Sequence, residues 1–562
     1  MKRIALLAAL CGFCAGVDRA EAPPPAVQQD GVVNAASEMP AEFSGGSIAP
    51  GSLFLIRAWR LGLTQPVRAP GYPLPERLAG LRVEVRQGGR TVAVPLVSAG
   101  ANEIEAILPS TVPVGDAELV IVREDSRSEP FRFRVVSASF GAFYAPGPRR
   151  GQGLIRNGAG PGDGVWNDLD HSAEPGGLVS LFGTGLGATS ESDTAPPRRL
   201  PVAVPSLQIS VGGAPVRRIA YSGRSARESG MDELVFEVPP NAPEGCHVPV
   251  QVRSASAASN FVSMAVRKGG GRCSDPGDWI RSASEQVRSA GVIVLNHTDL
   301  FLRMADGSSA RFRVDTAFGK FVENPPVHGS TDRWLSFPPP GTCTAQERFT
   351  HLRGMMTTVS PLDLIEGKAL DAGEQLTFSG AAGTRRIGKP QGSENTYGGV
   401  LGGNSPVPTA NNLPLFLRPG DYSISGKGPD TGVFTATVHA LRPIRWKDRD
   451  RIASVDRSRG VTVHWAAARP DDFVLIAAVN ADDDTGALGR ALCVASARQG
   501  SFTIPASALT NLPPTKPGPG LPLHTVWLLE VPGSAPAPFH GEKLDRGLAL
   551  YVSASGRTVD FR

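Results

Sequence analysis

The chain has 562 residues, too many for one hydrophobic core, so its length predicts about three or four domains. Its hydrophobic content of 41% excludes wholesale disorder, and its 65 glycines and 50 prolines are typical of many short strands joined by turns. The net charge of +4 is spread along the chain and forms no basic stripe, which argues against a nucleic-acid-binding protein.

Residues 1–22 predict a cleaved signal peptide. Met1 to Arg3 supplies a positive start, Ile4 to Val17 an apolar segment and Ala20 to Ala22 a small-x-small cleavage site. The alternative is an uncleaved anchor, but the apolar segment is shorter than the roughly 20 residues that span a bilayer. Residues 23–30 are polar and proline-rich, and they predict an extended, mobile leader. We therefore expect an exported protein whose mature chain is not inserted in a membrane.

Residues 31–137 predict a first immunoglobulin-like β-sandwich. Short segments rich in Val, Ile and Leu are separated by Gly, Pro, Asn or Ser, which is the spacing of sandwich strands. The expected strands are Ser52 to Ala58, Leu81 to Arg86, Thr91 to Ser98, Glu103 to Leu108, Ala117 to Arg123 and Phe131 to Val136.

Residues 138–268 predict a second module that repeats the first. Pro50 to Gly62 reads PGSLFLIRAWRLG, and Pro175 to Gly187 reads PGGLVSLFGTGLG. In both stretches a Pro-Gly turn precedes an apolar strand that ends in glycine, and the two align without a gap. An internal repeat of this kind indicates repeated domains.

Beyond residue 268 the repeat ends. Residues 269–341 predict a linker and a small, mostly-β region, and residues 342–562 predict a C-terminal β-sandwich region of one or two domains. Ala381 to Asn412 is poor in hydrophobic residues and rich in Gly, Asn and Ser, which predicts a long exposed loop. The expected fold class is all-β, with tandem immunoglobulin-like β-sandwiches followed by further β-sandwich domains.

Four cysteines remain after the signal peptide, an even number that predicts disulfides in an oxidising compartment. Cys246 opens one predicted strand and Cys273 follows the next. Antiparallel pairing brings these two positions together, which leaves Cys343 to pair with Cys493. The alternative is a metal site, but neither a C-x-x-C pattern among these four cysteines nor a zinc-type histidine spacing near them supports it.

Several short motifs occur in order over residues 30–268. They are Gly31 to Ser37 (GVVNAAS), Ser47 to Leu53 (SIAPGSL), Gly183 to Gly187 (GTGLG) and Val211 to Val216 (VGGAPV). In these motifs the chain resembles tandem immunoglobulin-like domains of the IPT/TIG type, and more closely a paralogous family of uncharacterised secreted acidobacterial proteins. The resemblance implies an exported β-sandwich protein and brings no catalytic residues with it.

No active-site motif accompanies this fold. The nine histidines are scattered without an H-E-x-x-H pattern, and no G-x-S-x-G elbow, P-loop or dinucleotide fingerprint stands between a strand and a helix. We therefore expect no enzyme, with no catalytic residue, cofactor or metal site.

Two acidic stretches contain the oxygen ligands that Ca²⁺ prefers. The first comprises Asp163, Asn167, Asp168 and Asp170, and the second is Asp482 to Asp484. Asp and Asn also favour solvated turns, which is the interpretation that we prefer for both stretches.

Five tryptophans are candidates for a sugar-stacking groove: Trp166, Trp334, Trp446, Trp465 and Trp527. Alternating apolar neighbours favour a core position for Trp465 and Trp527 instead.

The expected function is that of an exported, non-enzymatic, surface or periplasmic binding or structural protein, adhesion-like in character, whose rigid sandwiches present loops to a partner. The partner is expected to be an extracellular protein or a polysaccharide, and not a nucleic acid. Two alternatives remain open. One is a carbohydrate-binding protein that assists polysaccharide use, and the other is a hydrolase with a site in the C-terminal loops.

Overall fold

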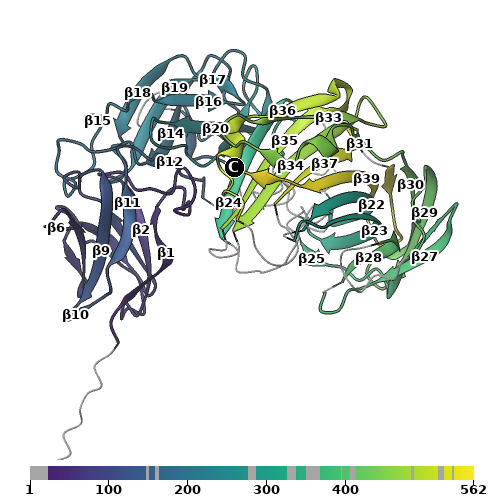
Figure 1. The fold of residues 1–562 in the computed structure, drawn as a ribbon, viewed down its shortest axis with the longest axis horizontal. Helices are drawn as coiled ribbons and strands as arrows, with labels where there is room; N and C mark the ends of the chain where they lie inside the picture. Colours follow the sequence, from purple (N-terminus) through teal and green to yellow (C-terminus); the bar gives the residue numbers. More distant parts are fainter. Residues whose placement is uncertain are drawn as a thin grey trace, which may run out of the picture.

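The computed structural model is nearly all β. Among the residues that it describes, the helical elements are one short α-helix, α2 (Ala506–Leu509), and two 3₁₀ turns, η3 (Arg449–Arg451) and η4 (Ala497–Gln499). Figure 1 shows two small β-sandwiches in the N-terminal half followed by a larger C-terminal part. The residues described are 23–146, 151–158, 164–275, 287–304, 306–325, 337–349, 367–393, 395–404, 413–482, 487–516, 524–534 and 537–562. The predicted signal peptide lies outside them.

The first module is a sandwich of two antiparallel sheets. One sheet has the order β1 (Ala26–Asn34), β2 (Leu53–Trp59), β8 (Glu103–Ile107), β7 (Leu96–Ala99) and β3 (Val67–Arg68). The other contains β10 (Ser126–Arg127), β9 (Gly115–Arg123), β5 (Leu81–Gln87) and β4 (Arg77–Leu78), with β11 (Phe131–Val135) and β6 (Arg90–Ala93) paired to β9 and β5. Alternate apolar residues of both sheets, such as Ile56 and Val83, form one buried core between them.

The prediction of a mobile leader is wrong for its second half. Residues 26–30 belong to β1, where Ala26 pairs with Trp59 and Val27 with Ala58. Polar composition did not prevent strand pairing, because the ladder uses backbone groups that every residue except proline carries.

The second module repeats the two-sheet plan. One sheet has the order β12 (Gly141–Ala142), β14 (Leu178–Thr184), β19 (Asp232–Glu237), β18 (Ile219–Arg224) and β15 (Leu200–Pro201), with β13 (Ile155–Asn157) on β14. The other has the order β17 (Ala214–Pro215), β16 (Gln208–Val211), β20 (Gly245–Arg253) and β21 (Val262–Val266). The core between them includes Leu181, Phe236 and Val250.

Hydrogen bonds join the two modules at the motifs that carry the family resemblance. Asn34 of GVVNAAS donates from Nδ2 to the carbonyl oxygens of Ser139 and Thr184, both at 3.1 Å, while its Oδ1 accepts from the amides of Ala36 at 2.9 Å and Ser37 at 3.2 Å. The hydroxyl of Thr184 accepts from the Leu53 amide at 2.8 Å. These motifs therefore form a tied joint between the modules.

Replacing Asn34 by alanine is expected to lower the free energy of unfolding of the N-terminal modules by about 2 kcal/mol, because buried amides and carbonyls lose their partners. Thermal unfolding of the full mature chain measures the change. Asn102→Ala, which removes an exposed amide from the same module, is the control and should change little. Equal effects of the two substitutions would contradict a role for Asn34 in the joint.

The C-terminal part is built on a ten-stranded sheet. Its order is β24 (Thr342–Phe349), β35 (Ala487–Ser496), β34 (Phe473–Asp482), β37 (Thr525–Val531), β39 (Arg546–Thr558), β22 (Ser289–Arg303), β23 (Ser309–Glu323) and β25 (Lys368–Ala369), with β28 (Thr396–Gly403) on β23 and β38 (Ala537–Phe539) on β39. Strands β22 and β39 pair in parallel, whereas the other neighbours are antiparallel. Residues 269–341 therefore do not form a separate β region: β22 and β23 belong to the same sheet as the strands of residues 342–562.

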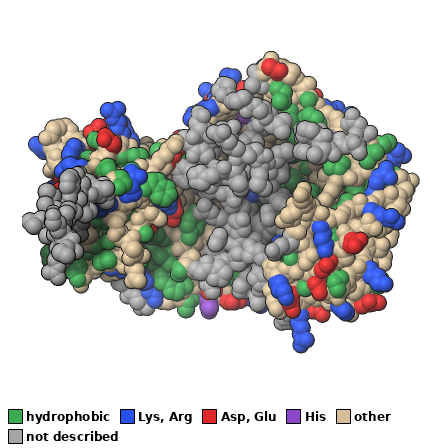
Figure 2. All heavy atoms as spheres, turned by 90° about the horizontal axis from the view of Figure 1, so that it is seen from below, with side chains coloured by type: hydrophobic (Ala, Val, Ile, Leu, Met, Phe, Trp, Pro, Cys, Tyr) green, Lys and Arg blue, Asp and Glu red, His purple; other side chains and the backbone are tan. Residues whose placement is uncertain are grey.

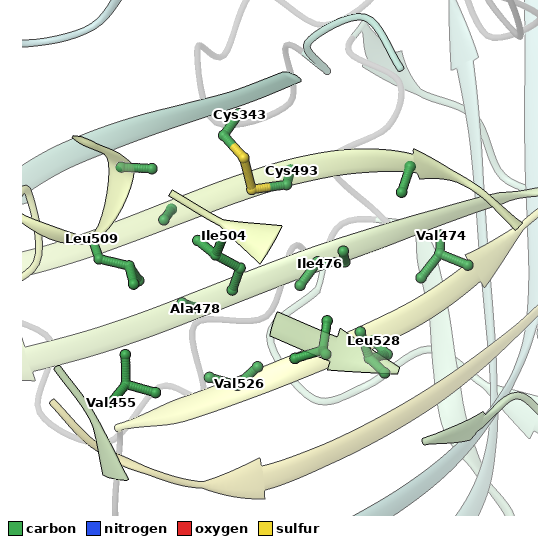
Figure 3. Packing of buried hydrophobic residues seen from close by; sticks show 14 of the residues in the cluster. Cys343, Val455, Val474, Ile476, Ala478, Cys493, Ile504, Leu509, Val526 and Leu528 are labelled. Carbon is green, nitrogen blue, oxygen red and sulfur yellow. A yellow bond between two sulfur atoms is a disulfide. The ribbon is translucent and has the colours of Figure 1, made fainter. Parts of the chain in front are cut away.

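Two smaller sheets cover one face of this sheet. One has the order β27 (Gly383–Gly388), β26 (Gln375–Gly380), β29 (Gly420–Gly428) and β30 (Gly432–Ala440), and the other β31 (Arg445–Trp446), β33 (Val461–Ala466) and β36 (Ser501–Ile504). A short pair of β32 (Ser454–Val455) and β40 (Asp560–Phe561) lies near the chain end. Each of these two sheets encloses its own core, which includes Phe378 and Phe434 under the first and Trp465 and Ile476 under the second. Figure 3 shows part of the second core, around Ile476.

The expected loop over residues 381–412 is corrected where the structure describes it, because two strands lie within it; residues 394 and 405–412 lie outside the described residues. Strand β27 pairs with β26, and β28 pairs with β23. The hydrophobic residues are few because glycines of β28 make room for neighbouring side chains: a Cβ on Gly398 would lie 3.3 Å from the Phe318 ring, and one on Gly399 would lie 3.1 Å from Ile387. In β28 the low hydrophobicity reflects close packing against larger side chains, whereas β27 is mostly exposed, as the sequence predicts.

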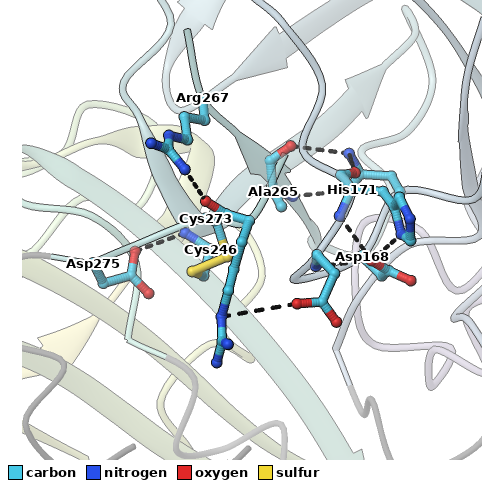
Figure 4. The surroundings of a disulfide bond; sticks show 10 residues. Asp168, His171, Cys246, Ala265, Arg267, Cys273 and Asp275 are labelled. Atoms are coloured by element: carbon cyan, nitrogen blue, oxygen red, sulfur yellow. Dashed lines mark hydrogen bonds and ion pairs between the residues drawn. A yellow bond between two sulfur atoms is a disulfide. The ribbon is translucent and has the colours of Figure 1, made fainter. Parts of the chain in front are cut away.

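Both disulfides join the pairs that the sequence favours. Cys246 and Cys273 are bonded at 2.06 Å, and Cys343 and Cys493 at 2.00 Å. The first bond lies beside the strand end at Ala265 and the loop of Asp168 (Figure 4). The second joins directly opposed residues of β24 and β35 within the buried core under the second cover (Figure 3).

Candidate functional site

A row of polar residues crosses the covered face of the ten-stranded sheet. Asp315 of β23 lies opposite His297 of β22, His297 opposite Ser553 of β39, and Ser553 opposite Glu530 of β37. Directly opposed residues of neighbouring strands share a face, so all four side chains point to the same side. Leu528 and Tyr551, each two residues away along its own strand, share that face and belong to the two different cores. The polar row thus marks a seam between the two covers.

Most of the row holds loop backbone in place. Asp315 binds the His297 ring at 2.6 Å through Oδ1, and its Oδ2 accepts from two successive amides, Phe416 and Leu417, both at 2.7 Å. The Ser553 hydroxyl accepts from the Ile444 amide at 2.9 Å. These contacts anchor the segments that lead into β29 and out of β30, so these residues have a structural role.

Only one of the two carboxylate oxygens of Glu530 anchors loop backbone. Its Oε1 accepts from the amides of Ala468 at 2.6 Å and Arg469 at 3.1 Å, in the connection between β33 and β34. Its Oε2 is buried, and no described residue donates a hydrogen bond to it. Burying an acceptor without a donor costs free energy, so we expect a water molecule or a ligand group to donate a hydrogen bond to this oxygen.

A cavity of about 200 Å³ opens at the seam beside this carboxylate. Its walls come from β30, the connection between β33 and β34, the end of β37, β38 and β39. The polar side chains on the walls belong to His439, Arg469, Asp472, Glu530, Ser534, Tyr551 and Ser553. At roughly 30 Å³ for each water in the liquid, this space suits one small polar molecule. Fewer apolar groups line it than is usual for a site for large hydrophobic ligands.

Two carboxyl groups on this wall have raised pKa values. Burial is the largest cause for Glu530, opposed by its two backbone hydrogen bonds and reinforced by the charge of Asp472. Burial also raises the pKa of Asp472, against the hydrogen bond that its Oδ1 accepts from the Gly533 amide at 3.2 Å. Burial and the nearby acidic groups raise the pKa of Tyr551 as well, so its hydroxyl stays protonated at neutral pH. The wall is thus acidic and poorly solvated.

This raised pKa predicts a pH dependence of stability. The pKa of Glu530 is higher in the folded chain, so the folded chain holds this proton more tightly than the unfolded chain does. Protonated Glu530 therefore contributes fully to the free energy of unfolding below its ordinary pKa of 4.5, and this contribution is lost as pH rises through the raised pKa. We expect the free energy of unfolding of the unsubstituted chain to fall relative to that of Glu530→Gln over this pH range. Chemical denaturation of both chains at a series of pH values measures the difference. A difference that is constant with pH would contradict this prediction.

The first acidic stretch is not a solvated turn at its centre. Asn167 and Asp168 are 3% and 8% exposed, and both side chains bind backbone. Asn167 donates to the Ala265 carbonyl at 2.9 Å and accepts from the Ala265 amide at 2.7 Å, while Asp168 accepts from the amides of Asp170 and His171, both at 2.9 Å (Figure 4). The loop is pinned to β21 rather than solvated. Asp163 and residues 483–484 lie outside the described residues.

The structure gives the expected core positions to Trp465 and Trp527, which are 0% and 5% exposed, and it also buries Trp446. Trp166 is partly exposed, with the guanidinium carbons of Arg156 and Arg227 at 5.7 and 5.1 Å from its ring centre. Trp334 lies outside the described residues. The described tryptophans therefore do not line one common groove.

Within the described ranges, no group of three or more His, Cys, Asp or Glu residues is arranged to hold a metal ion, and no helix is long and apolar enough to span a bilayer. On the lower face of the molecule, Lys and Arg side chains are interspersed with Asp and Glu where residues are described (Figure 2). The seam cavity, with the buried Oε2 of Glu530 on its wall, is therefore the candidate ligand site.

Sequence reasoning missed this site. Glu530 stands near the end of an apolar strand, TVWLLEV, where alternation predicts an ordinary polar position, and Asp472 stands in a turn. The available signal was a lone carboxylate inside an otherwise buried strand. This carboxylate indicates a site only once the fold brings residues 439, 472 and 530 together around one cavity.

No protein-family model matches the sequence, and no curated protein matches it. The expected membership in an acidobacterial family therefore gains no support here. Among solved structures, the chain is similar to the Plexin A4 full extracellular region at 11% identity and a TM-score of 0.16, with 42% of this chain and 18% of that chain covered.

Two bacterial proteins are similar at the same level. One is SGBP-B from the Bacteroides ovatus mixed-linkage glucan utilization locus, solved with a mixed-linkage heptasaccharide, at 10% identity and a TM-score of 0.16, with 82% of this chain and 93% of that chain covered. The other is invasin, a bacterial integrin-binding protein, at 10% identity and a TM-score of 0.13, with 87% and 75% covered. At such TM-scores, these likenesses carry no argument about function.

Proposed function

We propose that this chain is an exported, non-enzymatic binding protein that holds a small, hydrogen-bond-donating ligand in the seam cavity. The observation that carries the proposal is the buried Oε2 of Glu530, an acceptor without a described donor on the wall of a cavity. In this proposal the two N-terminal modules form a stiff arm, because the joint at Asn34 ties them together.

A second tie supports a continuous arm from the modules to the C-terminal part. Gln251 of β20 donates from Nε2 to the Ser507 carbonyl at 3.2 Å, and Asn511 donates to the Ser259 carbonyl at 3.3 Å. Phe261 of the second module also belongs to the core under the second cover. These contacts hold the cavity at a defined distance from the N-terminal module. We propose that the partner is a surface or periplasmic one and not a nucleic acid.

Export is supported by the two disulfides, since such bonds persist in oxidising compartments. N-terminal sequencing of the protein recovered outside the cytoplasm is expected to give a mature chain that starts at Ala22 or Pro23. Recovery of an intact Met1 chain whose six cysteines are all free thiols would overturn this part of the proposal.

The carbohydrate alternative is favoured over a protein partner by the cavity itself, which suits one sugar ring or chain end rather than a loop. Saturation-transfer NMR of the full mature chain with monosaccharides and small amines tests the binding function, with Glu530→Gln as the site control. The ligand signal is expected to weaken in Glu530→Gln. Absence of binding by every probe would overturn the proposed function, and turnover of chromogenic glycosides or esters would overturn its non-enzymatic character.

A further inference from the structure

The seam cavity has an imbalance of charge. Asp472 and Glu530 are 6% and 4% exposed, so two carboxyl groups lie on a wall that water hardly reaches. Arg469 and His439 also contribute to the walls, but their residues are exposed, and His439 binds the carboxylate of Asp421 at 2.6 Å. The buried part of the wall is therefore acidic. The exposed Arg469 lowers the pKa of both carboxyl groups through its charge, but burial outweighs this effect and both pKa values stay raised.

Burying carboxylates without a cation costs free energy, and a ligand that supplies one recovers it. A neutral polyol donates hydrogen bonds but leaves the negative charge uncompensated. An anion adds to the repulsion. A metal ion needs several ligands at once, and no cluster of this kind occurs among the residues that the structure describes.

An ammonium group meets these requirements. It carries one positive charge and donates three hydrogen bonds. Glu530, Asp472 and Tyr551 all line the cavity, and Oε2 of Glu530 has no described donor, so their side-chain oxygens are the candidate acceptors. Charge-assisted bonds of this type are stronger than neutral ones. The volume of about 200 Å³ leaves room for a small amine and not for a long cationic chain.

We infer that the seam cavity recognises a protonated primary amine, through the carboxylates of Glu530 and Asp472. The inference rests on the proposed binding function and specifies its ligand chemistry. Such an amine comes either from an amino sugar of an extracellular glycan or from a free small polyamine.

Calorimetric titration of the full mature chain near neutral pH tests the inference with matched probes. Glucosamine and putrescine represent the two sources, and glucose and N-acetylglucosamine are neutral partners of glucosamine. At least one amine is expected to bind about tenfold or more tighter than both neutral sugars, because a charged hydrogen bond is lost without the ammonium. Glucosamine binding alone identifies an amino sugar as the source, and putrescine binding alone identifies a free polyamine.

Variants place the binding at the cavity. Glu530→Gln and Asp472→Asn are each expected to weaken amine binding by about tenfold. Asp116→Asn, which removes an exposed carboxylate of the first module, should leave it unchanged. If Glu530→Gln fails to fold, Asp472→Asn provides the same test, with circular dichroism as the check on folding.

The outcomes separate the inference from the proposed function. Neutral sugars that bind as tightly as the amines would overturn the ammonium inference and leave the binding function standing. Amine binding that all three variants leave unchanged would also overturn it, because the amine then binds elsewhere. Failure of all four probes to bind would overturn both.

Discussion

Replacing both Cys343 and Cys493 by alanine is expected to lower the free energy of unfolding of the C-terminal part by about 5 kcal/mol, on the chain-entropy estimate for so long a loop. The two residues are 150 positions apart, so their bond closes a loop that contains most of the strands of the C-terminal part. It also ties the edge strand β24 to β35. Since domains are stable by only about 5–15 kcal/mol, the loss takes a large share of the total.

Removal of the other disulfide provides the matched control. Cys246 and Cys273 are 27 positions apart, and the same estimate gives about 3.5 kcal/mol for their bond. Calorimetric unfolding of the full mature chain, with each cysteine pair replaced in turn, separates the two effects. A larger loss for the short loop than for the long one would contradict the expectation.

Replacing Asp232 by alanine is expected to lower the free energy of unfolding of the second module by about 3–5 kcal/mol, because it leaves a buried charge unpaired. Asp232 is fully buried on β19 and forms an ion pair with Arg224 on β18. Its Oδ2 accepts from the amides of Gly185 at 2.7 Å and Leu186 at 2.8 Å. The substitution therefore removes the partner of a cation and of two amides together.

Asp116→Ala is the matched control for this substitution. Asp116 pairs with Arg134 at 2.7 Å, but the two side chains are 81% and 58% exposed. Such a pair contributes about 0–1 kcal/mol. Denaturant titration of the full mature chain compares the two variants, and equal losses would show that the Arg224 pair does not stabilise the module.

The two modules were predictable because their signals are local. Pro-Gly turns, short apolar strands and repeated glycines specify neighbouring antiparallel strands, and Cys246 and Cys273 flank one such pair. The motif GTGLG was recognisable as a repeat feature, but its role was not. Only the structure shows that Gly185 has a φ of 112° and that a Cβ there would lie 2.1 Å from the Ser139 carbonyl.

For the C-terminal part, the sequence predicted the individual strands but not how they pair in the sheet. Its sheet depends on the pairing of β22 with β39, whose residues 290 and 546 lie side by side although no turn connects them. No local pattern encodes a partner at that separation. The cavity follows from the same arrangement, because Glu530, Asp472 and His439 come from three separate connections or strands. Residue type alone could not distinguish them from ordinary surface positions.

The central place of β39 determines when the C-terminal part can fold. This strand lies between β37 and β22 in the sheet and follows both of them in the sequence. Until it emerges, β22 and β37 each lack a neighbour, and their unpaired backbone edges are open to wrong partners. The two N-terminal modules contain all their own strands and can fold earlier. Assembly therefore occurs in two separate events, and the second waits for β39.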